Sequence, residues 1–599
     1  MCTTFGYTLS DWQRQYQHSP QSVRETLHTH LASLDKQDNA WISLATTEQL
    51  EKQLADLLAR APSPSLPLWG VPFAVKDNID VAGWPTSAAC PAASYCATQD
   101  AEVVRRLKAA GAILMGKTNL DQFATGLVGT RSPFGAVSNS FDTRYISGGS
   151  SSGSASVLAR GFVAFSLGTD TAGSGRVPAG FNNIVGLKPT KGWLSSRGVV
   201  PACRLNDTVS LFALTVTDAY QLATLCGGYD PQEPYSRSSP REEVAQFTHQ
   251  PHFAIPDCVE FFGDTLAEAA WHKALAALKS AGVNLSIIDF TPFQQLAEQL
   301  YAGPWVAERS AVVDELLNHP DKLDPVVYRV IQQGRDYSAI DAYRAEYLRA
   351  SLSRQIAQAL QPFEALVVPT APTIHTLEAV AEDPITRNAQ LGIYTNFTNL
   401  ADLCALALPA PFRDDGLPAG ITLLATAWHD RALAEFGERW QHLLALPLGA
   451  TGKAFPKSPT PLPMSTHHVR VAVVGAHLRG MPLNYQLTTR GAAFIEQTQT
   501  ADNYRLFALL EGAIKKPGLL RSETGQAITV ELWDIPLARF GEFVAEIPAP
   551  LGIGSVSLQD GRTVKGFICE PTALTNALEI TEFGGWRYWL SQQQETENV

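Results

Sequence analysis

A proline-rich stretch near residue 455 divides the chain and limits what it can fold into. Five prolines lie between Pro447 and Pro463, interleaved with Gly, Ser and Thr, a composition typical of a semi-extended linker. The length of 599 residues alone would suggest about four domains. The linker instead predicts two, at residues 1–450 and 468–599, joined by residues 451–467.

Composition excludes several classes of protein. Hydrophobic residues make up 45 % of the chain, enough for large buried cores, and the net charge of -12 argues against nucleic-acid binding. We find no apolar signal core and no apolar run of about 18 residues for a membrane span. The eight cysteines show no CxxC pair or metal-ligand spacing, so we expect a cytoplasmic protein with no metal and no disulfide framework.

The first domain has the pattern of an α/β protein. Val71, Phe73 and Val75 alternate in a short apolar strand just before Lys76, and a helical pattern followed by a strand covers residues 101–119. A further apolar strand at residues 161–170 leads directly into a Gly-rich segment. Beyond the linker, strand signals separated by Gly turns predict a small α+β or β-rich domain.

Two Gly/Ser-rich segments carry most of the chemical signal. Residues 145–155 read first as a flexible loop, although Gly149–Gly153 also matches the GxSxG nucleophile elbow. The residues before that match are a poor strand, so the elbow is disfavoured.

Residues 166–180 form the second segment and follow a buried strand. Ser174 lies inside Gly-Ser-Gly, and the backbone N–H groups of Thr171, Ala172 and Gly173 could converge on an anion. A phosphate loop is the rival, but no Gly-Lys-Ser/Thr follows. We therefore favour a serine nucleophile beside an oxyanion hole.

Lys76 is the candidate base for such a nucleophile. It follows an apolar strand, and burial would shift a lysine toward its neutral, basic form. Taken alone, Lys76 could equally be a solvated charge at the end of a strand.

Three segments together, GVPFAVKDN, GGSSSGSA and GTDTAGSGRVPAG, resemble the signature segments of the amidase signature family. The resemblance covers roughly residues 20–445 and implies a large mixed β-sheet with helices on both faces and no cofactor. It implies a Ser–cis-Ser–Lys triad, in which Ser174 is the nucleophile, Lys76 the base, and Ser150, in the cis form, the proton relay.

Further segments, among them NLDQFATGLVGTRSPFG and VAVVGAHLRGMPLNYQL, are similar to the allophanate hydrolase branch of that family. The second of these lies in the extra C-terminal domain, which is related to the γ-glutamyl cyclotransferase fold. Two segments depart from the usual pattern: residues 170–176 read Asp-Thr-Ala-Gly-Ser-Gly-Arg, and ACRLNDTVSLFA lacks the expected Ser-Leu-Asp order.

The resemblance implies allophanate as the substrate, a small anion that an acidic protein must hold with a placed cation. Tyr301 and Arg309 lie eight positions apart in a helical segment and can share a helix face if the bend at Pro304 permits. Without the resemblance, a core tyrosine and a surface arginine would be the simpler interpretation. With it, both become carboxylate ligands and Gly126 a close backbone contact.

His477 is the candidate of the second domain, since it follows a strand and precedes a Gly turn. A structural histidine explains the position equally well. The resemblance implies that this domain converts N-carboxycarbamate to carbamate and carbon dioxide, with His477 involved and Asn484 a weaker candidate.

Two alternatives stay open. The chain could be another amidase, biuret-type or glutaminase-type, and its second domain a docking or oligomerisation module to which Trp533, Trp586 and Trp589 would contribute apolar surface. The resemblance also implies a homodimer and a functional link to urea carboxylase, while leaving open whether the allophanate comes from urea or from triazine and biuret breakdown.

Overall fold

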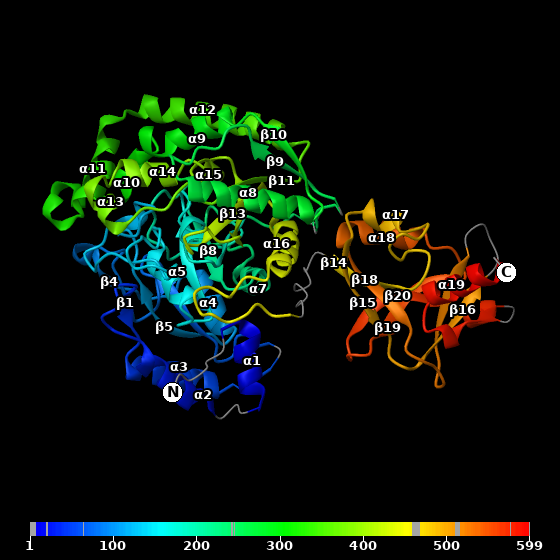
Figure 1. The fold of residues 1–599 in the computed structure, drawn as a ribbon. Helices are drawn as coiled ribbons and strands as arrows, with labels where there is room; N and C mark the ends of the chain where they lie inside the picture. Colours follow the sequence, from blue (N-terminus) through cyan, green and yellow to red (C-terminus); the bar gives the residue numbers. More distant parts are fainter. Residues whose placement is uncertain are drawn as a thin grey trace. The chain divides into compact units, whose positions relative to one another are not determined.

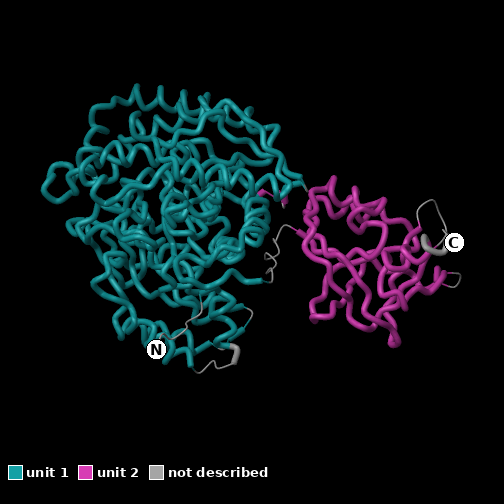
Figure 2. The backbone as a smooth tube through the Cα atoms, viewed as in Figure 1, with its two compact units in different colours: residues 1–239, 247–460 teal, residues 240–246, 461–599 magenta. Residues whose placement is uncertain are grey.

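The computed structural model describes residues 7–18, 22–60, 62–63, 65–240, 244, 246–248, 250–457, 468–509, 515–574 and 577–597. They form two compact units, residues 1–239 with 247–460 and residues 240–246 with 461–599 (Figure 2). The second unit thus includes a short segment from within the first half of the chain. Of the predicted linker at residues 451–467, residues 458–467 lie outside the described residues.

A mixed sheet of eleven strands, counted over the described residues, forms the centre of the first unit (Figure 1). Its order is β1 (Trp41–Leu44), β5 (Ile113–Thr118), β2 (Pro72–Lys76), β6 (Phe165–Asp170), β8 (Thr208–Ala213), β7 (Val185–Lys188), β12 (Leu403–Ala410), β13 (Ala419–Thr426), β11 (Ala365–Pro369), β9 (His252–Pro256) and β10 (Asn284–Ile288).

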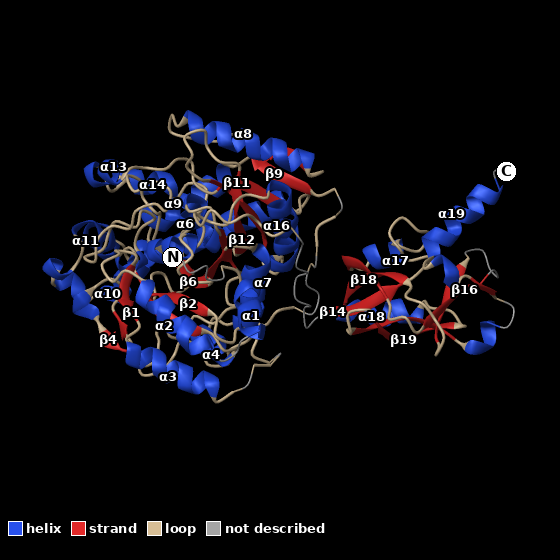
Figure 3. Ribbon diagram, turned by 60° about the horizontal axis from the view of Figure 1, so that its bottom comes forward, coloured by secondary structure: helices blue, strands red, loops and turns tan. Residues whose placement is uncertain are grey.

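Sixteen helices of the described residues accompany this sheet (Figure 3). They are α1 (Leu9–His18), α2 (Val23–Ser33), α3 (Thr47–Leu58), α4 (Glu102–Ala109), α5 (Ser152–Ala159), α6 (Val177–Phe181), α7 (Val216–Cys226), α8 (Thr265–Ser280), α9 (Thr291–Ala302), α10 (Val306–Val313), α11 (Pro325–Gln332), α12 (Ala339–Leu360), α13 (Leu377–Glu382), α14 (Thr386–Leu391), α15 (Phe397–Leu400) and α16 (Asp430–Leu444). A small hairpin, β3 (Pro85–Thr86) with β4 (Tyr95–Cys96), lies outside the sheet.

Helices cover both faces of the sheet, as predicted. Strand β12 shows this, because successive side chains of a strand point to opposite faces. Leu406 and Leu408 approach Gly437 of α16, whereas Ala405 packs in a core cluster with Phe397 of α15. Strands β2 and β6 are accordingly buried at every position, which is typical of parallel strands covered on both faces.

The register of β2 and β6 decides where the chemistry lies. The two strands are parallel neighbours, with Phe73 opposite Phe165 and Val75 opposite Leu167. Their carboxyl ends therefore meet at one edge of the sheet, and these ends carry Lys76 and the Gly-rich segment after Asp170. Helix α5, whose eight residues are all buried, packs against both strands.

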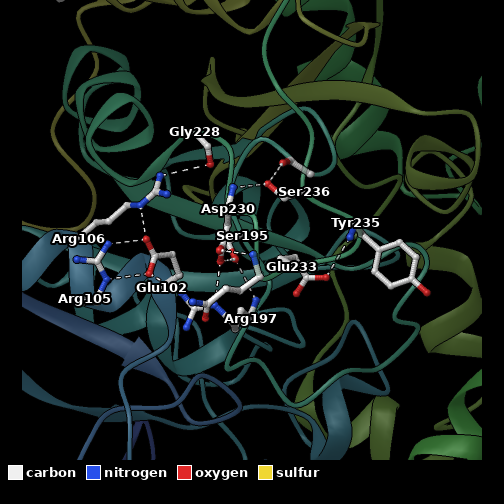
Figure 4. Close-up of polar contacts among 12 residues, drawn as sticks. Glu102, Arg105, Arg106, Ser195, Arg197, Gly228, Asp230, Glu233, Tyr235 and Ser236 are labelled. Carbon is white, nitrogen blue, oxygen red and sulfur yellow. Dashed lines mark hydrogen bonds and ion pairs between the residues drawn. The ribbon is translucent and has the colours of Figure 1, made fainter.

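A network of ion pairs and hydrogen bonds holds residues 228–236, which follow α7, against α4 and the segment around Arg197 (Figure 4). Glu102 of α4 accepts hydrogen bonds from Arg105, Arg106 and Arg197. Arg197 also donates to Asp230 at 2.9 Å. Two buried carboxylates, Glu102 and Asp230, thus hold the residues at the start of this segment.

The second unit is a small α+β domain, in agreement with the predicted class. Its main sheet has the order β15 (Ala493–Gln499), β18 (Thr529–Pro536), β14 (His468–Val473), β20 (Thr563–Cys569) and β19 (Leu551–Ser557). A smaller sheet joins β17 (Lys516–Arg521), β16 (Tyr504–Leu509) and β21 (Leu578–Glu579). Helices α17 (Tyr485–Thr488), α18 (Leu537–Ala545) and α19 (Trp586–Glu597) complete the described part.

The tryptophans of this unit are internal. Trp533, Trp586 and Trp589 are all buried in the unit's own hydrophobic core. They therefore contribute no apolar surface for docking or oligomerisation, so this part of the alternative interpretation of the second domain is wrong.

Candidate active site

Lys76 and Ser150 meet at the edge of the sheet where β2 ends. The Lys76 ammonium donates hydrogen bonds to Ser150 Oγ at 2.7 Å and to Thr169 Oγ1 at 2.7 Å. Lys76 and Ser150 are both fully buried. The lysine is thus removed from water, and the alternative of a solvated strand-end charge is wrong.

Burial has a direct chemical consequence for Lys76. Desolvation lowers the pKa of its ammonium from 10.5 to about 7, although nearby Asp121, Asp207 and Asp170 act in the opposite direction. Near neutral pH a large fraction of the amine is therefore unprotonated and able to accept a proton.

Ser150 follows a cis peptide bond from Gly149, the conformation that the resemblance implies. Its carbonyl oxygen accepts a hydrogen bond from the Asp121 N–H at 3.2 Å. The neighbouring Ser151 hydroxyl donates to the Thr169 carbonyl at 3.1 Å. The relay segment is thereby fixed on strand β6 and on the segment after β5.

Ser174 lies in the loop between β6 and α6, which is shaped by a buried ion pair. Asp170 accepts hydrogen bonds from the Gly173 and Gly175 N–H groups, each at 3.0 Å, and from Arg176 Nε at 2.9 Å. Burial alone would raise the pKa of Asp170, but Arg176 holds it below its usual range. Ser174 is only 2 % exposed, and its hydroxyl makes no hydrogen bond to any described residue.

The three expected oxyanion donors are not equivalent. The Gly173 N–H is already engaged with Asp170 Oδ1, so we correct the expectation that it faces a substrate. Thr171, Ala172 and Ser174 have backbone N–H groups without a partner among the described residues. Gly173 instead allows the turn, with a φ of 137° that side chains disfavour.

Tyr301 and Arg309 come together, but not on one helix. Tyr301 lies at the end of α9 and Arg309 lies in α10. Residues 303–305 between the two helices are not helical. Arg309 Nη2 donates to the Tyr301 hydroxyl at 3.2 Å, and the guanidinium lies 5.0 Å from the centre of the tyrosine ring. The expected bend at Pro304 is thus a complete separation of two helices.

Arg309 also contacts the segment that carries Gly126. Its Nη1 donates to Thr125 Oγ1 at 3.0 Å and to the Ala124 carbonyl at 3.3 Å. At Gly126 a Cβ atom would lie 2.6 Å from Asp121 Oδ2, so a larger residue would displace the buried Asp121 side chain. Tyr301, Arg309 and Gly126, the residues expected to bind substrate, therefore lie close together.

The Arg309 guanidinium is buried and incompletely paired. It is 1 % exposed, and its Nε–H has no hydrogen-bond partner among the described residues. Burial would lower the pKa of Arg309, but Tyr301 and Cys203 outweigh it and raise the pKa, so the group stays charged. Its charge also lowers the pKa of Lys76, which places both in one electrostatic environment.

His477 lies far along the chain, in the second unit. Its Nε2 is 2.7 Å from Gln486 Oε1, and its ring stacks on Phe567 with centroids 4.8 Å apart. Asn484 donates from Nδ2 to the His477 carbonyl at 2.8 Å, which is a structural contact. His477 lines a cavity of about 300 Å³ within this unit.

Sequence reasoning missed three residues that shape the first site: Thr169, Asp121 and Asp207. Thr169 is the second acceptor of Lys76, and its place near the end of a buried strand is the signal that could have identified it. Asp207 accepts from the Thr171 hydroxyl and from the N–H groups of Ala202 and Cys203. Asp121 lies in the segment NLDQFATGLVGTRSPFG, but the role of its carboxylate depends on partners seven to ten residues further on.

Neither a membrane-spanning helix nor a metal cluster is found in the part of the chain that the structure describes. No described helix is long and apolar enough to cross a bilayer. Within the same residues, no group of three His, Cys, Asp or Glu side chains is placed to hold a metal ion.

Comparison with known proteins adds two family matches. Residues 22–434 match the amidase family, and residues 469–591 match the allophanate hydrolase C-terminal domain. An allophanate hydrolase from Kluyveromyces lactis has a solved structure that is 43 % identical, with a TM-score of 0.85; the match covers 98 % of this chain and 100 % of that one.

Two relatives show the range of the family. The urea amidolyase of Saccharomyces cerevisiae is 42 % identical over 99 % of this chain, which spans only 34 % of that longer protein. A glutamyl-tRNA(Gln) amidotransferase polypeptide of Methylacidiphilum infernorum is 31 % identical over 71 % of this chain and 91 % of its own length.

Proposed function

Because the chain belongs to the amidase family, we propose that its first domain hydrolyses the terminal amide of allophanate. The observation that carries this proposal is Arg309, a buried cation with an unpaired Nε–H. An unsatisfied buried donor is costly, and a substrate carboxylate would satisfy it while neutralising the charge. The similarity to a K. lactis allophanate hydrolase over nearly the whole chain supports the same substrate.

Acylation uses the buried lysine as the base. Neutral Lys76 takes a proton from Ser150, and Ser150 takes the proton of Ser174 as Ser174 Oγ attacks the amide carbonyl. The 2.7 Å contact between Lys76 and Ser150 supports this order. The proton then returns to the departing nitrogen, so ammonia leaves and an acyl-enzyme remains.

The developing oxyanion is held by backbone N–H groups of Thr171, Ala172 and Ser174, since Gly173 is occupied. Such a donor contributes about 2.7–4 kcal/mol to lowering the barrier. Water then attacks the acyl-enzyme by the reverse proton route and releases N-carboxycarbamate. Tyr301 and Arg309 hold the carboxylate throughout, and Gly126 lets the substrate approach the backbone.

The second domain assists the loss of carbon dioxide from N-carboxycarbamate, with His477 as the residue involved. The match of residues 469–591 to the allophanate hydrolase C-terminal domain supports this assignment. The overall products of the chain are then ammonia and carbon dioxide.

A homodimer, a link to urea carboxylase and a cytoplasmic location complete the proposal. Ile340, Tyr343 and Tyr347 lie on one face of α12 and are each more than 60 % exposed, an apolar stripe that a second copy could cover. Urea carboxylation yields allophanate, and the urea amidolyase relative is far longer than this chain. The seven described cysteines are free thiols, as in a reducing compartment.

The test is an ammonia assay on allophanate and on neutral amides of similar size, with the intact chain and with Arg309→Ala. We expect the variant to lose allophanate turnover while retaining its activity on neutral amides. Equal losses on both substrates, or no ammonia from allophanate with the intact chain, would refute the substrate assignment.

A further inference from the structure

The turn that precedes strand β8 takes no part in the mechanism. It comprises residues 202–207 and is here called the 202–207 loop. It belongs to ACRLNDTVSLFA, the segment that departs from the usual family pattern. Leu205 is 46 % exposed, whereas Cys203 and Asn206 are buried, so the side chains of this loop reach both the solvent and the interior.

Asp207 joins the 202–207 loop to the oxyanion donors. Its carboxylate accepts a hydrogen bond from the Thr171 hydroxyl. Within the loop, it also accepts from the N–H groups of Ala202 at 2.8 Å and Cys203 at 3.1 Å. Thr171 is one of the expected oxyanion donors, so the position of its backbone is coupled to this loop.

Asn399 forms a second bridge at the same end of the loop. Its Nδ2 donates hydrogen bonds to the Asp170 carbonyl and to the Asn206 carbonyl, each at 2.8 Å. Asn399 is fully buried, and Asp170 is the last residue of β6. Two independent contacts therefore fix the loop to the segment that carries the nucleophile.

Glu308 connects the loop to α10, the helix that carries Arg309. Glu308 Oε1 accepts a hydrogen bond from the Leu205 N–H at 2.7 Å. The Cys203 thiol donates a weaker one to the Trp305 carbonyl at 3.9 Å, directly before the first residue of α10. The 202–207 loop thus contacts the carboxylate-binding helix on one side and the oxyanion segment on the other.

The contact that Glu308 makes is costly in free energy. Its second oxygen, Oε2, is buried and has no hydrogen-bond partner among the described residues. A buried acceptor left unpaired is destabilising, and such atoms are uncommon in native proteins except where function explains them. Stability alone therefore does not account for a glutamate at this position.

We propose that the 202–207 loop sets the separation between the two ends of the substrate site, with Glu308 as the positioning residue. The carboxylate of the substrate is held by Arg309 and its reacting amide by the oxyanion donors, and the loop holds these two groups in register. The inference rests on the proposed function, because it takes the residues of that site as the two ends. Glu308 acts through Arg309 and so favours substrates that engage both ends.

The test is steady-state kinetics of the full chain with allophanate and with propionamide, a small neutral amide without a carboxylate. Glu308→Ala removes the bond to the Leu205 N–H, so kcat/KM for allophanate should fall roughly tenfold or more. Asp207 and Asn399 still hold the oxyanion segment in this variant, so kcat/KM for propionamide should change by less than about twofold.

Two conservative variants separate the length of the side chain from its charge. Glu308→Gln keeps an acceptor oxygen at the same reach and should retain most of kcat/KM for allophanate. Glu308→Asp keeps the charge but is one CH2 shorter, so it should show the selective loss. The reverse order would mean that the charge beside Arg309 matters and not the hydrogen bond, and it would overturn the inference.

Glu315→Ala is the matched control. Glu315 lies just beyond α10, is exposed, and its side chain makes no hydrogen bond or ion pair with any described residue, so the ratio of the two kcat/KM values should not change. An equal fall for both substrates in Glu308→Ala, or no fall for either, would overturn the inference while the proposed function stands. No ammonia from allophanate with the unmodified chain would refute the proposed function itself.

A double-mutant cycle tests the path through the loop. Thr171→Val keeps the backbone N–H of residue 171 but removes the hydroxyl that donates to Asp207. Because each substitution breaks the same connection, the double variant should turn over allophanate little more slowly than the slower single variant. If the two losses multiply as independent effects, the loop does not couple the two ends and the inference is wrong.

Discussion

The first site and the cavity beside His477, here called the His477 pocket, hold their polar groups in opposite ways. At the first site, Lys76, Asp170, Arg176 and Arg309 are all buried, and most of their polar atoms already have partners inside the protein. In the His477 pocket, Lys516 is half-buried and unpaired among the described residues. The first arrangement suits covalent chemistry, which needs groups fixed before the substrate arrives. The second suits a step in which the ligand supplies most of the charge.

Removing the nucleophile should give the largest effect and should affect only the first site. Ser174→Ala should lower ammonia release from allophanate by a factor on the order of 10⁴ to 10⁶, because no other group can form the acyl-enzyme. Residual turnover close to that of the unmodified chain would remove Ser174 from the mechanism.

The next largest effect should come from the carboxylate pocket. Arg309→Lys keeps a charge but loses the fork that contacts Tyr301 and Thr125, so kcat/KM for allophanate should fall roughly 10²-fold. Steady-state kinetics with a neutral amide as the second substrate provides the control. A fall of the same size for both substrates would indicate damage to the triad.

pH should separate the two regions, because their steps need opposite protonation states. Lys76 must be neutral to act, and its pKa is about 7, so the rate of acylation should drop about tenfold per pH unit below that value. Burial also lowers the pKa of His477, but His477 must be protonated to donate, so carbon dioxide loss should speed up as the pH falls. Rapid-quench measurement of both products across pH 5.5–8.5, an interval of about three units around the pKa of Lys76, tests this, and parallel profiles would contradict it.

The smallest effect should follow the loss of one hydrogen bond. Tyr301→Phe removes the hydroxyl that accepts from Arg309 at 3.2 Å but leaves the ring beneath the guanidinium. We expect kcat/KM for allophanate to fall a few-fold, roughly 3- to 10-fold. An effect as large as that of Arg309→Lys would mean that Tyr301 has a role in the chemistry itself.

The same contrast explains how far the sequence could be interpreted. Ser174 lies in a Gly-rich segment after an apolar strand and Lys76 ends another apolar strand, so local patterns made both of them candidates. The role of Ser150 was implied only by the resemblance to the amidase signature family. The α/β class followed from the order of strand and helix patterns, and the cover on both faces was implied by the resemblance. The complete burial of strands such as β2 and β6 agrees with that cover.

What could not be predicted depends on contacts between distant segments. The Gly173 N–H donates to the Asp170 carboxylate because of the three-dimensional path of the loop between them, which the sequence does not reveal. Nor does hydrophobic periodicity show that residues 303–305 separate two helices. Lys516 becomes notable only once Glu546 is seen to be paired with Arg490. A lysine at the first position of a short strand carries no such signal in the sequence.

The central claim is that two sites act in turn on one substrate, the first releasing ammonia and the second carbon dioxide. It is tested most directly by following both products during a single turnover of allophanate by the full chain and by His477→Gln. We predict ammonia release at the same rate in both proteins, with carbon dioxide delayed in the variant. Ammonia and carbon dioxide slowing together in His477→Gln, or carbon dioxide release unaffected by the substitution, would contradict this account.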